Sequence, residues 1–157
     1  TSRLEFQYVH EQQFTQEMME IAGQVDFRGM LEEGSFITQG VDPQTIERLV
    51  FGQKVFVTKG TTLIQEGEPN DAIFVVGAGV LGVYVHGVQV ASVGPGQVTG
   101  LYTMLKKTTA SATVRVDSEK AYVLQLRHGH FMNCLEGNEQ VLARMQTLLH
   151  EREFQNR

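Results

Sequence analysis

The chain has too few cysteines for an internal disulfide, and it has no long apolar run of the kind that spans a membrane. It contains one cysteine, Cys134, no tryptophan and three prolines in 157 residues. One cysteine excludes an internal disulfide and favours a reducing compartment, so we expect a cytoplasmic location. No apolar run approaches the ~20 residues that cross a bilayer and no signal peptide is visible, so direct membrane contact is not expected. The chain begins with Thr1 rather than Met, so we expect either a processed product or a segment of a larger protein, whose own membrane attachment stays open.

A surplus of basic residues and the common catalytic motifs are also missing. The net charge of −5 arises in residues 1–33, where seven acids meet two bases, and the remaining eleven acids and eleven bases balance. Without a basic face that could release counterions, nucleic-acid binding is not expected. The sequence has no Gly-x-Ser-x-Gly, P-loop, Cys-x-x-Cys or dinucleotide motif. We therefore expect no enzyme activity, and we interpret Cys134 as an apolar helix residue rather than a nucleophile.

What the chain does contain is enough apolar sequence for one compact domain. At this length ~68–70% of the unfolded surface is buried on folding. A hydrophobic content of 41% with 16 glycines indicates a turn-rich globular protein. The sequence pattern divides it into an N-terminal helical segment (1–53), a β-roll (54–127) and C-terminal helices (128–157).

The middle part alternates apolar and polar residues with period two and is rich in valine, which is typical of strands. His86–Gly87 is the clearest hairpin signal. Short alternating strands must meet another apolar face, so we expect an α+β fold, mainly β: an antiparallel β-roll or jelly roll of about eight strands, flanked by N-terminal helices and a C-terminal helix pair. The expected strands include Val55 and Val57, Leu63, Ile73–Val76, Val80–Val85, Val88–Val93, Ala112–Val116 and Tyr122–Leu126.

Helical periodicity appears on both sides of the strands. The N-terminal helices are expected at residues 10–22, stopped near Gly23, at 26–33, and from a cap at Asp42 to about residue 50. The C-terminal pair is expected at 130–135 and from a cap at Asn138 to about residue 153. The last helix carries one apolar stripe, formed by Val141, Leu142, Met145, Leu148 and Leu149.

Residues 94–114 have the pattern of a phosphate-binding loop: a glycine-rich turn, one short helix and a returning strand. Gly100 allows a ligand to approach the main chain, and the helix that opens at Leu101 would direct unpaired N–H groups toward an anion. Lys106 and Lys107 are the only charged residues in this stretch. It therefore lacks a carboxylate for sugar hydroxyls and a guanidinium for a phosphate.

This stretch resembles the phosphate-binding cassette of the cyclic nucleotide-binding domain family, which includes the catabolite activator protein and the regulatory subunits of protein kinase A. Gly96 and Gly100 match the two glycines of the cassette, and Ala112–Val114 matches its strand. The glutamate that holds the ribose falls on Leu101, and the arginine that neutralises the cyclic phosphate falls on Ala110. The resemblance covers about residues 42–153, with further matches at Lys59–Gly60, Glu66–Gly67–Glu68, Asp71, Gly79, Gly87, Gly94 and Met104–Leu105.

The resemblance implies a regulatory ligand-sensing module of a larger protein, such as a transporter, channel or signalling protein, with a degenerate pocket for a small-molecule ligand. The loss of both charged groups weakens the free energy of binding by several kcal/mol, which would turn micromolar cyclic AMP binding into millimolar binding. We therefore expect no cofactor, or a cyclic nucleotide bound weakly. The candidate pocket consists of Thr99, Gly100, Leu101, Tyr102, Ala110, Ser111 and Thr113.

Three alternatives remain open from the sequence. The pocket could still bind a cyclic nucleotide through backbone amides, Ser111 and a lysine, Lys106 or Lys107. The roll could instead be a scaffold for a homodimer formed through the helix at 138–153. His128 and His130, with Glu136 and His86, are loosely similar to a cupin metal site, but they lie where strands give way to a helix, and no metal is expected.

Overall fold

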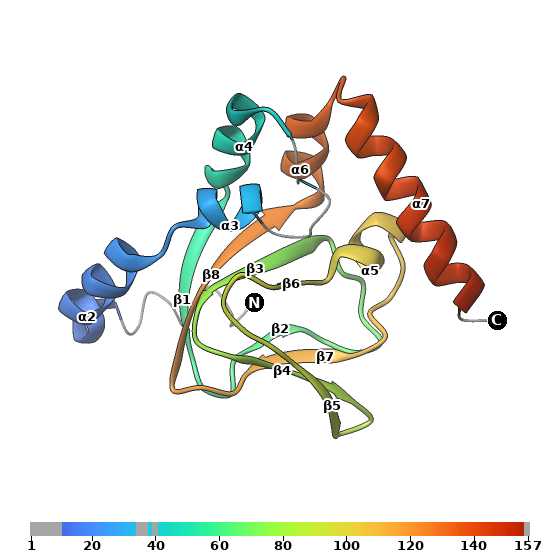
Figure 1. The fold of residues 1–157 in the computed structure, drawn as a ribbon. Coiled ribbons are helices and arrows are strands. Elements are labelled where there is room, and N and C mark those ends of the chain that lie inside the picture. The colour runs from blue at the N-terminus through green and yellow to red at the C-terminus, as the bar shows by residue number, and fades with distance from the viewer. Residues whose placement is uncertain (1–10, 34–37, 39–40, 156–157) are drawn as a thin grey trace.

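A computed structural model of the chain describes residues 11–33, 38 and 41–155. The antiparallel β-roll with flanking helices that was expected from the sequence is confirmed (Figure 1). The helices are α2 (Glu11–Gln24), α3 (Phe27–Glu33), α4 (Pro43–Val50), α5 (Leu101–Lys106), α6 (His128–Leu135) and α7 (Glu139–Gln155). The strands are β1 (Gln53–Thr58), β2 (Thr62–Ile64), β3 (Ala72–Ala78), β4 (Leu81–Val85), β5 (Val88–Val93), β6 (Val98–Thr99), β7 (Thr113–Val116) and β8 (Lys120–Arg127).

The strands form two antiparallel sheets of four strands each. One has the order β1-β8-β3-β6 and the other β2-β7-β4-β5. Their long pairings join strands distant in sequence: Val55 lies opposite Val123, and Val83 lies opposite Val114. The hairpin expected at His86–Gly87 joins β4 to β5, with positive φ of 51° and 81° at its two residues, as a tight primed turn requires.

The central strands β3 and β8 of the sheet β1-β8-β3-β6 are buried on both faces, which explains their nearly continuous apolar runs. Inside the roll, Phe74 and Val123 belong to a cluster shared with the second sheet. On the outer face, Ile73 and Leu124 pack in a second cluster with residues from the helices α3, α4, α6 and α7. The molecule therefore has two cores that share one sheet, and the helices stand on the outer core (Figure 1).

The helix boundaries follow the sequence signals closely where a cap is present. Asp42 accepts hydrogen bonds from the Thr45 N–H (3.1 Å) and hydroxyl (2.9 Å), and α4 begins at Pro43 as expected. Asn138 likewise accepts a hydrogen bond from the Val141 N–H at 3.1 Å at the start of α7. Without such a cap the expectation was less accurate, because α6 begins two residues earlier than expected, at His128.

Strand β6 was not expected from the sequence. It has only two residues, Val98 and Thr99, which pair with Val75 and Phe74 of β3. Two residues are too few to show an alternating pattern, and the surrounding glycines indicate only a turn. This pairing fixes the entry to α5, and with it the position of the candidate cassette.

The described residues include no helix that is both long enough and apolar enough to cross a membrane.

Candidate functional site

A cavity of about 1010 Å³ lies between the cassette, the sheet β2-β7-β4-β5 and helix α7. Its size is at the upper end of the range of small-molecule sites. Residues distant in sequence meet here, since Ile64, the cassette and helix α7 all contribute to the lining. The lining residues are Ile64, Val83, Val98, Thr99, Gly100, Leu101, Tyr102, Thr103, Ala110, Ser111, Ala112, Val114, Gln140, Ala143, Arg144, Thr147, Leu148 and Glu151.

Gly100 gives the cassette its shape. Its φ of 90° lies in the left-handed region, and α5 begins directly after it. A Cβ at this position would lie 2.9 Å from the Ala72 carbonyl oxygen and 2.9 Å from Cδ1 of Ile64. Only glycine therefore allows the turn to approach strands β2 and β3 so closely.

Asn70 holds the same turn through its side chain, which is 9% exposed. Its amide nitrogen donates to the Gly100 carbonyl and to the Thr103 hydroxyl, both at 3.1 Å. Its amide oxygen accepts from the Ala72 N–H at 3.3 Å. A buried amide with three partners fixes one position of the cassette relative to β3.

Among the seven residues expected at the pocket, the structure brings six together on the cavity surface: Thr99, Gly100, Leu101, Tyr102, Ala110 and Ser111. Thr113 is not among the lining residues, whereas its neighbour Val114 is. In strand β7 successive side chains alternate between faces. The Thr113 hydroxyl accepts from the Glu66 N–H at 3.0 Å and from the Gln65 side-chain amide at 3.2 Å. Whether the six others contact a ligand stays a prediction.

The cassette side of the cavity carries no formal charge. Leu101 and Ala110, where the family pattern has its acid and its base, both line the cavity. The main chain of Ala110 is held on both sides of its Cα: its N–H donates to the Glu68 carbonyl at 2.8 Å, and its carbonyl accepts from the Gly67 N–H at 2.9 Å. The cassette therefore keeps a hydrogen-bonded main chain, while its side chains at positions 101 and 110 cannot form an ion pair with a ligand.

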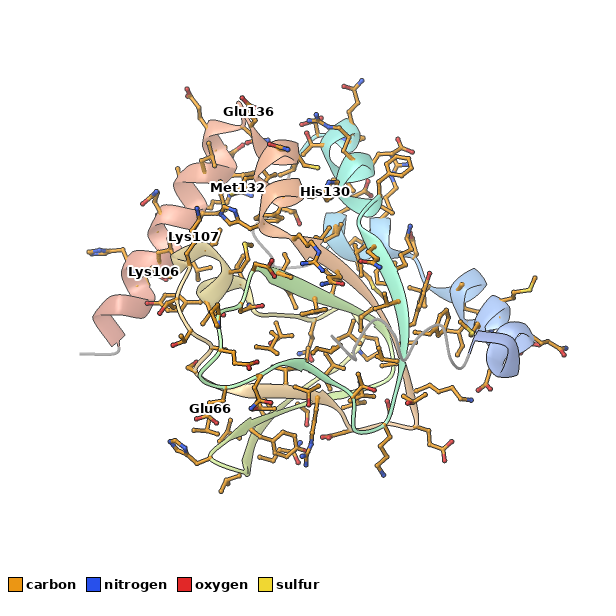
Figure 2. The ribbon with its side chains drawn as sticks, turned by 180° about the vertical axis from the view of Figure 1, so that it is seen from behind. Glu66, Lys106, Lys107, His130, Met132 and Glu136 are labelled. Atoms are coloured by element: carbon orange, nitrogen blue, oxygen red, sulfur yellow. The ribbon has the colours of Figure 1, made fainter. Side chains whose placement is uncertain are left out.

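Neither lysine of the cassette lines the cavity. Lys106 and Lys107 are exposed at the end of α5, beside α7 (Figure 2). The geometry therefore gives no support to a lysine that replaces the missing arginine.

Helix α7 forms the opposite wall, and the candidate pocket residues expected from the sequence include none of its residues. Gln140, Arg144, Thr147 and Glu151 recur at intervals of three or four residues and lie on one helix face toward the cavity. Among the lining residues that the structure describes, Arg144 and Glu151 alone carry formal charge. The available signal was this polar periodicity next to the apolar stripe, but polar spacing also marks any solvated helix face.

The apolar stripe of α7 is used within the same chain. Val141 and Met145 are 1% and 4% exposed and belong to the outer core, and Leu142 and Leu148 pack against it. The stripe thus attaches α7 to the fold, and a homodimer formed through this helix stays a prediction.

The histidine and cysteine candidates do not form a site. In the described part of the chain, no group of three His, Cys, Asp or Glu side chains could hold a metal ion. His130 lies on α6, with Glu136 just beyond that helix. The candidate His86 donates its N–H to Glu66, which lies on the opposite side of the roll (Figure 2). Cys134 Sγ lies 3.7 Å from Nε2 of His130, but burial raises the pKa of the thiol. A protonated, buried thiol is a weak nucleophile at neutral pH.

Comparison with known proteins agrees with this geometry. A cGMP-dependent protein kinase, egl-4 of Caenorhabditis briggsae, is 30% identical over 95 residues, which is 60% of this chain and 13% of the kinase. The chain thus spans a small part of that relative's length. Among solved structures, the N-terminal domain of a transcriptional regulator from Streptomyces coelicolor A3(2) matches with a TM-score of 0.66 and 22% identity, covering 80% of this chain and 91% of that one.

A second solved structure is the regulatory subunit of a cAMP-independent protein kinase A from Trypanosoma cruzi bound to guanosine. It has a TM-score of 0.64 and 15% identity, and the match covers 73% of this chain and 41% of that one. At these identities the two structures show the fold alone. The family model described as the cyclic nucleotide-binding domain matches residues 54–138, more than half of the chain. This match, together with the roll, the cassette turn and helix α7 described above, shows that the chain belongs to the cyclic nucleotide-binding domain family.

Proposed function

We propose that this chain is a regulatory ligand-sensing module of a larger protein, and that its cavity no longer binds cAMP or cGMP with high affinity. The observation that carries the proposal is the pair Leu101 and Ala110. Both line the cavity, and neither supplies the charge that the family pattern places there. A module of this kind has no catalytic step of its own, and we place it in the cytoplasm on the basis of its single cysteine.

The size of the expected loss follows from ordinary hydrogen-bond energetics. A hydrogen bond to a charged group contributes about 1.5–3 kcal/mol, so two lost charged contacts weaken binding by several kcal/mol. Each 1.4 kcal/mol is roughly a factor of ten, which gives a loss of about a thousandfold. Lys106 and Lys107 lie outside the cavity lining and do not offset this loss.

A relative of the same fold supports a change of ligand. The Trypanosoma cruzi regulatory subunit is described as cAMP-independent and bound to guanosine. Guanosine has no phosphate, so a site for such a molecule has no need for a phosphate-binding arginine. The part of the cassette that lines the cavity carries no charge, which is compatible with a ligand that is not a cyclic nucleotide.

Signalling would proceed through helix α7. Its lining face contacts the cavity while its apolar stripe packs on the outer core, so a ligand that binds one placement of α7 more tightly shifts the chain toward that placement. A domain attached to the helices would then respond. A pure dimerisation scaffold receives less support, because Val141 and Met145 are already buried within the chain.

Isothermal titration of the chain with cAMP and with cGMP tests this proposal. We expect no saturation in the micromolar range. The double variant Leu101→Glu/Ala110→Arg should gain affinity by about a hundredfold or more, since it restores both charged contacts.

The matched control is Leu101→Gln/Ala110→Gln, which adds side chains of similar length without charge and should gain little. Far-ultraviolet circular dichroism would verify that both variants are folded. Saturable micromolar binding to the unmodified chain would contradict the proposal.

A further inference from the structure

The charged groups of the cavity are confined to one wall. The cassette and the roll contribute aliphatic side chains, hydroxyls and main-chain groups, whereas α7 contributes Arg144 and Glu151 among the described lining residues. The family pattern places its two charges on the cassette. In this chain the charged residues that line the cavity therefore lie on α7 and not on the cassette.

We propose that the cavity binds a small amphipathic organic anion, with its apolar body against the roll and its single anionic group on Arg144. This inference rests on the proposed function, because it requires the cavity to be a ligand site. The anionic group is a carboxylate or a sulfonate, each of which offers the oxygen pair that a guanidinium binds.

The apolar part of the ligand is specified by the roll. Ile64, Val83, Val98 and Val114 come from four different strands and line the cavity together with Leu101. Such a wall favours a ring or short hydrocarbon body, since each apolar Å² removed from water stabilises the complex by about 25 cal/mol. A small polar ion such as free phosphate would leave this surface without a partner.

The anionic part is specified by Arg144. The residue is half-buried and lines the cavity beside aliphatic groups, where an ion pair is screened less than on an open surface. Arg144 already interacts with another group of the protein, but a guanidinium has five N–H donors and can bind an oxyanion as well.

Glu151 limits the charge of the ligand. It lies seven residues after Arg144, about 10 Å along the same face of α7. A carboxylate in that position repels a second negative group and accepts a hydroxyl or amine hydrogen instead. The site therefore favours a monoanion over a dianion, and an anionic end oriented toward Arg144.

The placement on α7 also links charge recognition to the position of the helix. The anion gains the Arg144 contact only when α7 lies on the cavity, whereas contacts with the roll are available in either position. The charged contact is thus a source of differential affinity between the two placements, which a neutral ligand of the same shape lacks.

A pair of fluorescent probes that differ only in charge tests the inference. 1-Anilinonaphthalene-8-sulfonate has an apolar double-ring body with one sulfonate, and N-phenyl-1-naphthylamine has the same body without it. We expect the purified chain to bind the sulfonate at one site, about tenfold more tightly than the neutral probe at low salt, and this preference should fall as salt is added.

Three variants locate and assign the binding. Arg144→Gln should weaken the sulfonate about tenfold and leave the neutral probe unchanged. Lys107→Gln removes a nearby positive charge that does not line the cavity and should leave both affinities unchanged. Ala143→Trp fills the cavity from an exposed position of α7 and should reduce the binding of both probes.

The outcomes separate this inference from the proposal on which it rests. If both probes bind and Ala143→Trp blocks them, but Arg144→Gln leaves their affinity ratio unchanged, the anion assignment is wrong and the ligand site stands. If neither probe binds, or if Ala143→Trp has no effect on either, the cavity is not the binding site and both proposals fail.

Discussion

The two walls of the cavity are held in place by different interactions. On the cassette wall the main chain is fixed. Gly100 packs against β2 and β3, the Asn70 side chain donates a hydrogen bond to the Gly100 carbonyl, and both the N–H and the carbonyl of Ala110 are hydrogen-bonded. On the α7 wall the helix is attached through its apolar stripe, and its lining residues are largely exposed. The comparison teaches that shape and charge, which the family combines in one cassette, are separable: here the cassette keeps the shape and α7 carries the charge.

The largest effect is expected from breaking the fixed wall at Gly100. In Gly100→Ala the new methyl group meets the Ala72 carbonyl and Ile64 at 2.9 Å, in addition to the strain of a left-handed φ. We expect a loss of about 2–4 kcal/mol in the free energy of unfolding, measured by guanidinium denaturation.

Gly96→Ala is the matched control. Its φ of 84° is similar, but a Cβ there meets nothing within 4 Å. Only the backbone strain remains, about 1–2 kcal/mol. Equal losses in the two variants would mean that the close approach of Gly100 contributes nothing to the cassette.

Asn70→Ala should have an intermediate effect on the same wall. It removes three hydrogen bonds and leaves the buried Ala72 N–H and Thr103 hydroxyl with fewer partners. The expected loss is about 1–3 kcal/mol in the free energy of unfolding. Asn133→Ala, at an exposed position of α6, should change stability by less than about 0.5 kcal/mol. A similar loss in both would show that Asn70 does not hold the cassette.

The smallest effect concerns how helices start on the two sides of the molecule. Helix α5 follows Gly100, which provides no side-chain cap, whereas α4 follows Asp42, whose carboxylate accepts from Thr45. These hydrogen bonds, from the hydroxyl first, lower the pKa of Asp42 below its usual 3.8. The cap therefore stabilises the fold fully above pH 3.8, and this contribution is lost as the pH falls through the lowered value.

Asp42→Asn separates capping from titration, because asparagine is also a good cap. The difference in Tm between the unmodified chain and this variant should favour the unmodified chain at neutral pH and shrink below pH 3.8. Adding Thr45→Val to both should reduce the pH dependence, since it removes the hydroxyl donor. A Tm difference independent of pH would contradict this assignment.

The parts of the fold that the sequence revealed are those with a local physical signal. Period-two runs marked the longer strands, and His86–Gly87 marked a hairpin. Asp42 and Asn138 marked helix starts because their side chains cap within three residues. Strand β6 was missed because its two residues are specified by pairing with β3, far away in sequence.

For the same reason, the cassette side of the cavity could be predicted from the sequence and the α7 side could not. The cassette residues are contiguous, so the glycine pattern and the family resemblance located them together. Arg144 and Glu151 reach the cavity only because α7 folds back over α5, and nothing local distinguishes them from a solvated helix face. Thr113 does not line the cavity, because a cassette pattern identifies the segment, while the alternation of side chains along strand β7 decides which of them face the cavity.

The connection between α6 and α7 has a consequence for how specificity can evolve. Gly137, with φ of 83°, joins the two helices, and four of the six lining positions of α7 are exposed. Mutations there change what the ligand meets at little cost to folding, whereas Ile64, Ala110 and Val114 are buried and resist replacement. Relatives sharing this roll could thus diversify their chemical repertoire by altering one helical face, leaving the inherited scaffold untouched.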